Sequence, residues 1–284
     1  MVRLQSRCRN TGACIQPDGA FDALRPEPWR SLEAMLRVIE WIGSIARFIG
    51  STVKSAVFPP YEWRELLKQI DDIGSRSLPL VGAAGAAIGI VLAMQTRSTL
   101  ARFGADALLP SMIAIAVVRE LGPVITGLMV AGRIGAGLAA ELGSMRVTEQ
   151  IDALEVSAVD PLRYLVAPRV LACTLAMPLL TVYCDLIALI GGYGAASITM
   201  ETSMRLYFDA SMEVIGFVDL VPSIAKTAVF GFIIGVIGCY EGYSTRGGTA
   251  GVGRSATAAV VLSSLMVILS DVVLVKLSQI IFGQ

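Results

Sequence analysis

The stretch AGRIGAGLAAELGSMRVTEQIDAL, residues Ala131–Leu154, contains the two kinds of segment from which this chain is built. Its first half is rich in glycine and alanine, and a helix with such small side chains can approach other membrane helices closely. Its second half is charged and amphipathic, which is typical of a segment that contacts something in water. The stretch therefore predicts a membrane helix that runs into a contact surface for a soluble partner.

The composition of the whole chain indicates an integral membrane protein. Its 284 residues are 55% hydrophobic and 16% charged, with a mean hydropathy of +0.69, which is too apolar for an ordinary soluble domain. The formal net charge is zero, so no basic field predicts binding to nucleic acid. The five cysteines form no C-x-x-C pair, and we interpret them as buried or cytoplasmic thiols rather than metal ligands.

Two absences from the sequence exclude whole classes of catalytic site. The chain contains no histidine, which removes histidine-based triads and H-E-x-x-H zinc sites. It also contains no G-x-x-x-x-G-K-[ST] motif, so it has no P-loop with which to hydrolyse ATP. We therefore expect a protein that is not an enzyme and binds no cofactor itself.

Five apolar stretches are long enough to cross the ~30 Å hydrocarbon core of a bilayer. They are Ser77–Thr96, Ala107–Ala140, Val170–Met200, Val221–Tyr240 and Ser255–Ile281. The predicted fold is an all-α integral membrane protein with a five-span domain over residues 77–284. The small-residue faces Gly82/Gly85/Gly89 and Gly231/Gly235 predict close helix packing, either within one subunit or across a dimer.

The residues ahead of the first span divide into two parts. Residues 1–30 contain three prolines and five arginines and have no signal peptide, which predicts a disordered cytoplasmic tail. Within residues 31–76, apolar residues recur every three or four positions from Ser31 to Val57 with charges between them. This pattern favours an amphipathic helix in the membrane interface, with a helix packed on a soluble domain as the alternative. A short charged helix, Tyr61–Ile73, then leads into the first span.

The distribution of lysine and arginine around the spans predicts the orientation. With the N-terminus inside, eight basic residues flank the inner ends of the spans and four flank the outer ends. Since inner loops are enriched in basic residues, we expect a cytoplasmic N-terminus and a periplasmic C-terminus. The inner residues are Arg64, Lys68, Arg76, Arg146, Arg163, Arg169, Arg246 and Arg254, and the outer ones are Arg97, Arg102, Arg205 and Lys276.

The R-E-L-G-P stretch, Arg119–Pro123, puts two charges inside the second span. Arg119 falls ~18 Å into that helix, where a charge costs ~3 kcal/mol even on lenient insertion scales. The proline cannot donate to the carbonyl four residues earlier, so we expect a kink or an opened turn. We favour a substrate pocket or gate at Arg119 and Glu120. The alternative is an internal ion pair with Asp185 or Lys226 that only fixes the helix order.

The loop between the second and third spans, residues 141–169, contains a second candidate site. Its core predicts a short helix with Val147, Ile151 and Leu154 on one side. Ser144 or Thr148 is expected to cap this helix. From the residues alone we favour a helix that lies on its own protein over one that contacts a partner.

Four motifs, in this order and spacing, resemble the MlaE/YrbE family of permease subunits. They are R-E-L-G-P, the opening stretch A-G-R-I-G-A-G-L-A-A-E-L-G-S-M-R-V-T-E-Q-I-D-A-L, V-D-P-L-R and G-G-T-A-G-V-G-R-S-A-T. The resemblance covers roughly Val53–Gln284. It implies a homodimer in the bacterial inner membrane, a pair of cytoplasmic P-loop ATPase subunits that bind ATP, and MCE-domain proteins on the outer side. The cargo that it implies is phospholipid.

The resemblance also implies roles for individual residues, and it reverses our preference for the loop helix. The E-Q-I-D-A-L segment resembles the coupling helix that docks into the ATPase, and Arg119 and Glu120 resemble residues beside the lipid cavity. The predicted coupling residues are Glu149, Gln150, Ile151, Asp152, Ala153 and Leu154. Two alternatives remain. One is an ion-coupled secondary transporter that uses Arg119, Glu120, Asp185 and Lys226 as a relay, and the other is a membrane anchor for MCE proteins.

Overall fold

The computed structural model describes residues 40, 43–55, 63–198 and 203–282, and the chain divides into two units, residues 1–48 and 49–284. The predicted tail over residues 1–30, and the expected start of the interfacial helix, lie outside the described residues. In the first unit residues 43–48 are helical, and the second unit begins with the helical residues 49–55. The described part of the expected interfacial segment is therefore helical.

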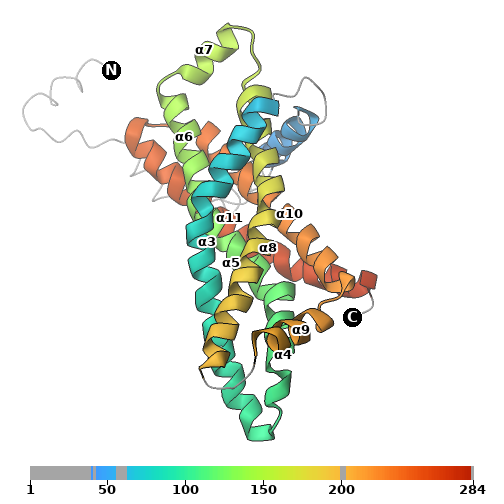
Figure 1. The fold of residues 1–284 in the computed structure, drawn as a ribbon. Coiled ribbons are helices and arrows are strands. Elements are labelled where there is room, and N and C mark those ends of the chain that lie inside the picture. The colour runs from blue at the N-terminus through green and yellow to red at the C-terminus, as the bar shows by residue number, and fades with distance from the viewer. Residues whose placement is uncertain (1–39, 41–42, 56–62, 199–202, 283–284) are drawn as a thin grey trace, which may run out of the picture. The chain divides into compact units, whose positions relative to one another are not determined.

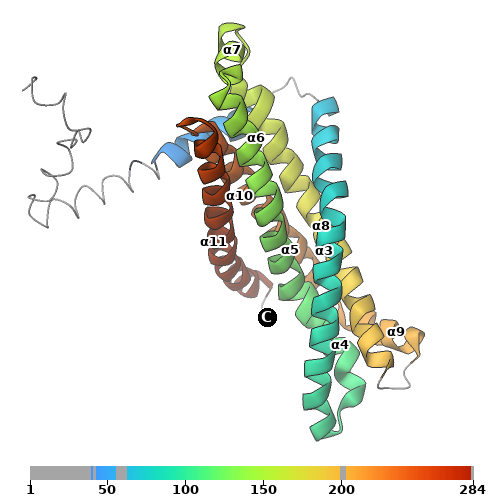
Figure 2. The ribbon, with the colours of Figure 1, turned by 90° about the vertical axis from the view of Figure 1, so that its left-hand side faces the viewer.

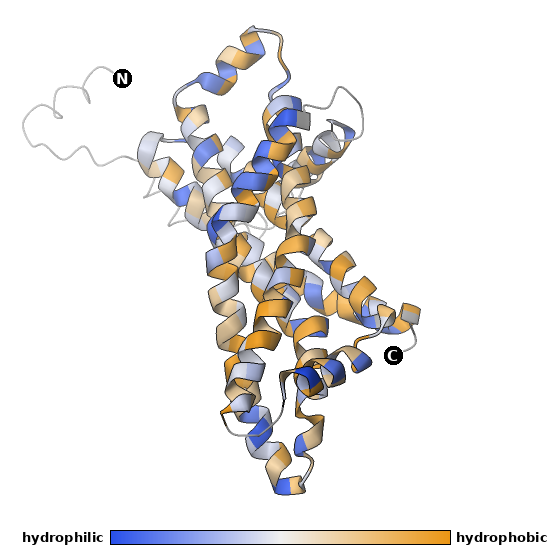
Figure 3. Cartoon of the chain, viewed as in Figure 1, coloured by the Kyte–Doolittle hydropathy of each residue, from blue (hydrophilic) through white to orange (hydrophobic). Residues whose placement is uncertain are grey.

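Five helical segments among the described residues are long and apolar enough to cross a membrane (Figure 1). They are Arg64–Phe103, Asp106–Val147, Leu162–Ser197, Asp219–Tyr243 and Gly248–Ile281. Figure 3 shows hydrophobic residues along the middle of these helices and hydrophilic residues more often towards their ends. The prediction of an all-α membrane protein with five spans is confirmed.

The spans are built from the following helices. The first is α3 (Trp63–Leu100), and the second combines α4 (Leu109–Ala116), α5 (Gly122–Val130) and α6 (Ala136–Val147). The third is α8 (Ala167–Ser197), the fourth α10 (Phe217–Tyr243) and the fifth α11 (Gly248–Phe282). Two short helices lie between spans: α7 (Gln150–Val156) follows the second, and α9 (Met204–Val214) follows the third.

The second span is interrupted by π-helical turns, at Val117–Leu121 and at Ala131–Gly135. In the first of these the N–H of Gly122 donates to the carbonyl of Val117, five residues back. Pro123 comes next and cannot donate to the helix ladder, so the wider turn accommodates its ring. The opened turn that the proline predicts is confirmed.

The small-residue faces pack within this one chain, on both sides of α8. A Cβ atom at Gly89 of α3 would lie 1.9 Å from the carbonyl oxygen of Ala188, and one at Gly231 of α10 would lie 2.5 Å from that of Cys173. No side chain fits at such distances, so the glycines let these backbones touch. Figures 1 and 2 both show α3 and α8 side by side over much of their length.

The short helices α7 and α9 lie at opposite ends of the spans (Figure 1). At the α9 end, the Ser111 hydroxyl of α4 donates to the carbonyl of Ala210 at 3.2 Å. The buried ring of Tyr207 in α9 packs edge-on against Tyr193 of α8, with centroids 5.5 Å apart. α9 is thus attached to the spans, and the two ends are called the α7 end and the α9 end below.

Candidate functional site

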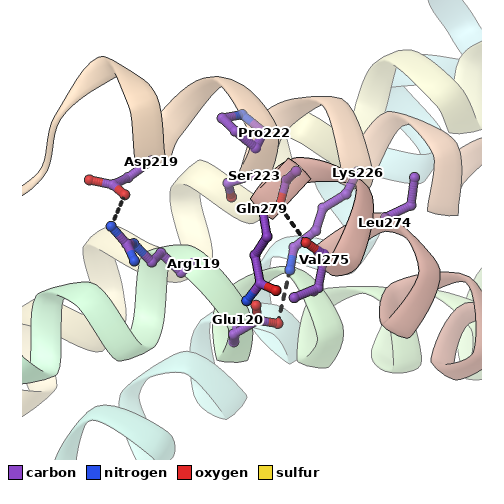
Figure 4. Close-up of a pocket in the computed structure, with 10 residues that line it drawn as sticks. Arg119, Glu120, Asp219, Pro222, Ser223, Lys226, Leu274, Val275 and Gln279 are labelled. Atoms are coloured by element: carbon purple, nitrogen blue, oxygen red, sulfur yellow. Dashed lines mark hydrogen bonds and ion pairs between the residues drawn. The ribbon is translucent and has the colours of Figure 1, made fainter. Parts of the chain in front are cut away.

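A small polar pocket lies where the second span meets α10 and α11 (Figure 4). Its volume is about 80 Å³, well below the ~300 Å³ at which drug-sized sites begin. It is lined by Arg119, Glu120, Asp219, Pro222, Ser223, Lys226, Leu274, Val275, Ser278 and Gln279. The structure therefore brings both residues predicted from the R-E-L-G-P stretch into one pocket.

The two neighbouring charges, Arg119 and Glu120, have different partners on α10. Nη2 of Arg119 lies 2.5 Å from Oδ1 of Asp219. Nζ of Lys226 lies 3.0 Å from Oε2 of Glu120 and 3.1 Å from Oδ1 of Asp271 on α11. Figure 4 shows the contacts of Arg119 with Asp219 and of Lys226 with Glu120, which join the second span to α10. The contact of Lys226 with Asp271 joins α10 to α11. The ion pair of Glu120 with Lys226, one of those considered from the sequence, is therefore present. Both of its residues line the pocket.

The charges differ sharply in their exposure. The side chain of Lys226 is 7% exposed and that of Asp219 is 10% exposed, whereas those of Arg119 and Glu120 are 40% and 45% exposed. A charge buried among apolar helices is stable only when it is paired, so Lys226 depends on its two carboxylates. Arg119 and Glu120 have accessible surface that a ligand can contact.

The pocket extends from the α9 end towards the middle of the spans. Asp219 lies in the first turn of α10, and Lys226 lies two turns further along, a rise of ~10 Å. The sequence places the Arg119 backbone near mid-membrane, but its guanidinium reaches the first turn of α10. A long arginine side chain can extend in this way towards the polar edge of a membrane.

Asp185 of α8, the other predicted partner, takes no part in these ion pairs. Its side chain is 7% exposed, and its Oδ1 has no hydrogen-bond partner among the described residues. A Cβ atom at Gly122 would lie 1.7 Å from that oxygen, so Asp185 packs against the backbone just after the π-helical turn. It supports the second span from the side of α8.

Sequence reasoning missed the two carboxylates that pair with the cations of the pocket, Asp219 with Arg119 and Asp271 with Lys226. Asp219 precedes the predicted fourth span, Val221–Tyr240, and Asp271 lies within the predicted fifth span, Ser255–Ile281. The signal was the seven-residue spacing between Asp219 and Lys226, which puts both on one face of a helix. This spacing predicts a shared helix face only if the helix begins before Asp219, as α10 does.

The predicted coupling segment forms a separate helix rather than a continuation from Val147. α6 ends at Val147, and Glu149 has a φ of 60°, so the chain turns before α7 begins at Gln150. The predicted cap is wrong: Glu149 occupies the N-cap position and no side chain caps α7. The hydroxyl of Thr148 instead donates to the carbonyl of Ser144 at 2.9 Å, within the preceding helix.

One buried residue and two polar contacts attach α7 to the protein. Ile151 is completely buried. Arg146 forms an ion pair with Asp152, and the hydroxyl of Tyr243 donates to Oε1 of Glu155 at 3.2 Å. The other predicted residues of α7 are more open: Gln150 and Ala153 are exposed and Leu154 is half-buried.

The remaining surface of α7 is available to another molecule. Val156 is 89% exposed, a large apolar side chain at the far end of the helix from Glu149. Together with Asp152 and Ala153 it forms an outward surface, while Ile151 faces the protein. The structure thus contains both candidate regions: a charged pocket within the spans and an attached but exposed helix outside them.

Five apolar helices, three of which line a charged pocket, indicate a multi-pass membrane protein. The model of one family, described as Permease MlaE, matches residues 66–277, which is most of the chain. The chain therefore belongs to the MlaE permease family.

Named relatives cover most of the chain. A probable ABC transporter permease protein of Rickettsia felis is 38% identical over 242 residues, which is 85% of this chain and 93% of the relative. The intermembrane phospholipid transport system permease protein MlaE of Haemophilus influenzae is 34% identical over 222 residues, 77% of this chain and 83% of the relative. The chloroplastic protein TRIGALACTOSYLDIACYLGLYCEROL 1 of Arabidopsis thaliana is 36% identical over 82% of this chain and 67% of its own length.

Proposed function

We propose that the chain is the membrane subunit of an ABC transporter that moves phospholipids or related lipids between the bacterial inner membrane and an MCE-domain protein. Separate ATPase subunits would supply the energy. The observation that carries this proposal is the pocket containing Arg119 and Glu120, in a chain whose relative in Haemophilus influenzae is named for intermembrane phospholipid transport.

The pocket offers a recognition group for the phosphate of a lipid. Arginine binds phosphate through two parallel N–H donors, and the guanidinium of Arg119 is 40% exposed. Asp219 holds the guanidinium in the absence of cargo and would be displaced by the phosphate. At about 80 Å³ the pocket is too small for a whole lipid, so loading requires the second span to separate from α10 and α11.

A second copy of the chain would complete the cavity. α11 is the least buried of the five spans: only 17% of its most apolar stretch of 18 residues is buried. The outward residues Val261, Leu265 and Val272 are between 48% and 66% exposed. Because α11 also lines the pocket, we propose that a homodimer forms on this helix and encloses the lipid path between the two subunits.

The exposed surface of α7 would contact the ATPase on the cytoplasmic side. In this arrangement the α7 end faces the cytoplasm, whereas the α9 end and the C-terminus face the periplasm and the MCE-domain protein. ATP would bind to the partner and not to this chain. Closure of the ATPase would move α7, and α6 would pass that movement along the second span to the turn that holds Arg119 and Glu120.

The π-helical turns make the second span suitable for this role. Such turns have a looser ladder than an α-helix and are frequent at functional sites. One lies at Val117–Leu121, around the pocket, and the other at Ala131–Gly135, between the pocket and α7. A change in pairing at these turns gives the two-state element that coupling between distant sites requires.

The test is to purify the tagged chain from its own membranes and to analyse the co-purifying proteins and lipids. The proposal predicts a P-loop ATPase and bound phospholipid together. With Arg119→Ala, the co-purifying phospholipid should fall several-fold while the ATPase remains. With Leu154→Arg, phospholipid should remain while the chain no longer stimulates the ATPase. Lipid transport by the chain without any ATPase would support an ion-coupled transporter instead. MCE proteins retained with no effect of ATP on lipid would support an anchor.

A further inference from the structure

A second polar cavity lies near the α7 end, apart from the pocket described above. Its walls come from the helical residues 49–55 and from the start of the third span. Its volume is about 350 Å³, several times that of the pocket at Arg119. It is lined by Ser51, Lys54, Ser55, Asp160, Leu162 and Arg163. Neither the proposed lipid path nor the proposed ATPase contact uses these residues.

The lining of this cavity is suited to an anion. Among the described residues that line it, the cations are Lys54 and Arg163 and the carboxylate is Asp160. Oδ1 of Asp160 accepts the N–H of Leu162 at 3.0 Å, so this carboxylate caps the first turn of the third span. Lys54 is exposed and forms no ion pair with any residue that the structure describes. Among the described lining residues the cations thus outnumber the carboxylate by one, and two serine hydroxyls that can donate hydrogen bonds lie beside them.

The cavity also lies at one end of an apolar helix that is long enough to cross a membrane. Leu162 and Arg163, which line the cavity, are the first two residues of the helical segment Leu162–Ser197. Val53 precedes Lys54 in the sequence, and Tyr164 follows Arg163. Each of these two side chains is 42% exposed and offers apolar surface beside a cation. Basic cavities between helices at the end of a span are typical binding sites for anionic headgroups, with acyl chains along the neighbouring apolar surface.

We propose that this cavity binds the phosphate of an anionic phospholipid, as a site separate from the transport pocket. Lys54 and Arg163 bind the phosphate oxygens, and the hydroxyls of Ser51 and Ser55 complete the contacts. Because Asp160–Arg163 is the connection from α7 to the third span, the bound lipid joins that connection to the helical residues 49–55.

The test measures binding of a short-chain phosphatidylglycerol to the purified full-length chain, by native mass spectrometry and by the shift in melting temperature. Short-chain phosphatidylcholine and inorganic phosphate are measured in parallel. Phosphatidylglycerol should bind at least tenfold more tightly than phosphatidylcholine. The double variant Lys54→Gln/Arg163→Gln should weaken that binding by about fivefold for each cation removed. Arg205→Gln on α9, which removes an exposed cation at the other end, is the matched control and should bind normally.

Two further variants separate loss of the site from loss of the fold. Lys54→Gln alone changes an exposed side chain, so the variant should fold and still bind less lipid, and Lys54→Arg should restore binding. Equal binding of phosphatidylglycerol by the parent and the double variant would overturn the proposal. Equal binding of phosphatidylcholine would overturn the preference for an anionic headgroup. A full response to inorganic phosphate would assign the site to soluble phosphate instead of a lipid. The same comparison in an Arg119→Ala background removes lipid bound at the transport pocket, so the remaining difference in binding reports this cavity alone.

Discussion

The pocket and α7 are both charged regions at the second span, but their charges are stabilised in opposite ways. In the pocket, Lys226 is 7% exposed and is held by Glu120 and Asp271 from two other helices. At α7, Arg146 and Asp152 form a pair whose side chains are 35% and 52% exposed. Water can replace the second pair but not the first. Stability and function should therefore be coupled in the pocket and separable at α7.

The largest effect is expected for Lys226→Met. The change leaves Asp271, 16% exposed, and Glu120 without their shared cation, and removal of one partner of a buried pair costs about 3–5 kcal/mol. We expect a large fall in melting temperature in detergent. The triple variant Lys226→Met/Glu120→Gln/Asp271→Asn removes the stranded charges and should recover most of the loss. A single variant as stable as the parent would contradict the buried network.

Arg119→Ala should have a smaller effect on stability and a larger one on lipid. Its partner Asp219 keeps a second contact, because Oδ2 accepts the N–H of Gly216 at 3.1 Å. The expected cost is therefore ~1–3 kcal/mol, the range for a partly satisfied buried polar group. Phospholipid that co-purifies with the transporter should fall several-fold, as measured by phosphorus assay. Arg119→Lys keeps the charge without the bidentate geometry and should give an intermediate value.

Asp152→Ala should barely change stability. The pair that it removes is exposed, and such pairs contribute ~0.2–1 kcal/mol. Its matched control is Ile151→Ala, which removes a completely buried side chain and should loosen α7, with increased hydrogen exchange over Gln150–Val156. Increased exchange in Asp152→Ala but not in Ile151→Ala would mean that the surface pair, rather than Ile151, holds the helix in place.

The comparison also explains which features could be predicted from the sequence. The five spans could be predicted from long apolar stretches and the opened turn from Pro123, because both follow from local chemistry. The partner of Arg119 could not be predicted, because Asp219 lies 100 positions away and its place depends on how α10 packs against the second span. The start of α7 was missed for a local reason: Glu149 has a positive φ, which side-chain patterns do not reveal in a residue other than glycine.

We infer that α7 and the pocket at Arg119 serve one transport cycle, in which α7 contacts the ATPase and the pocket binds the lipid. The most direct measurement follows ATP-dependent movement of a fluorescent phospholipid by the purified complex that contains Ala153→Arg, which places a bulky cation on the exposed surface of α7. We expect this variant to fold normally and to keep its bound phospholipid, but to lose ATPase stimulation and lipid movement. ATP-dependent lipid movement at the parent rate would contradict this inference.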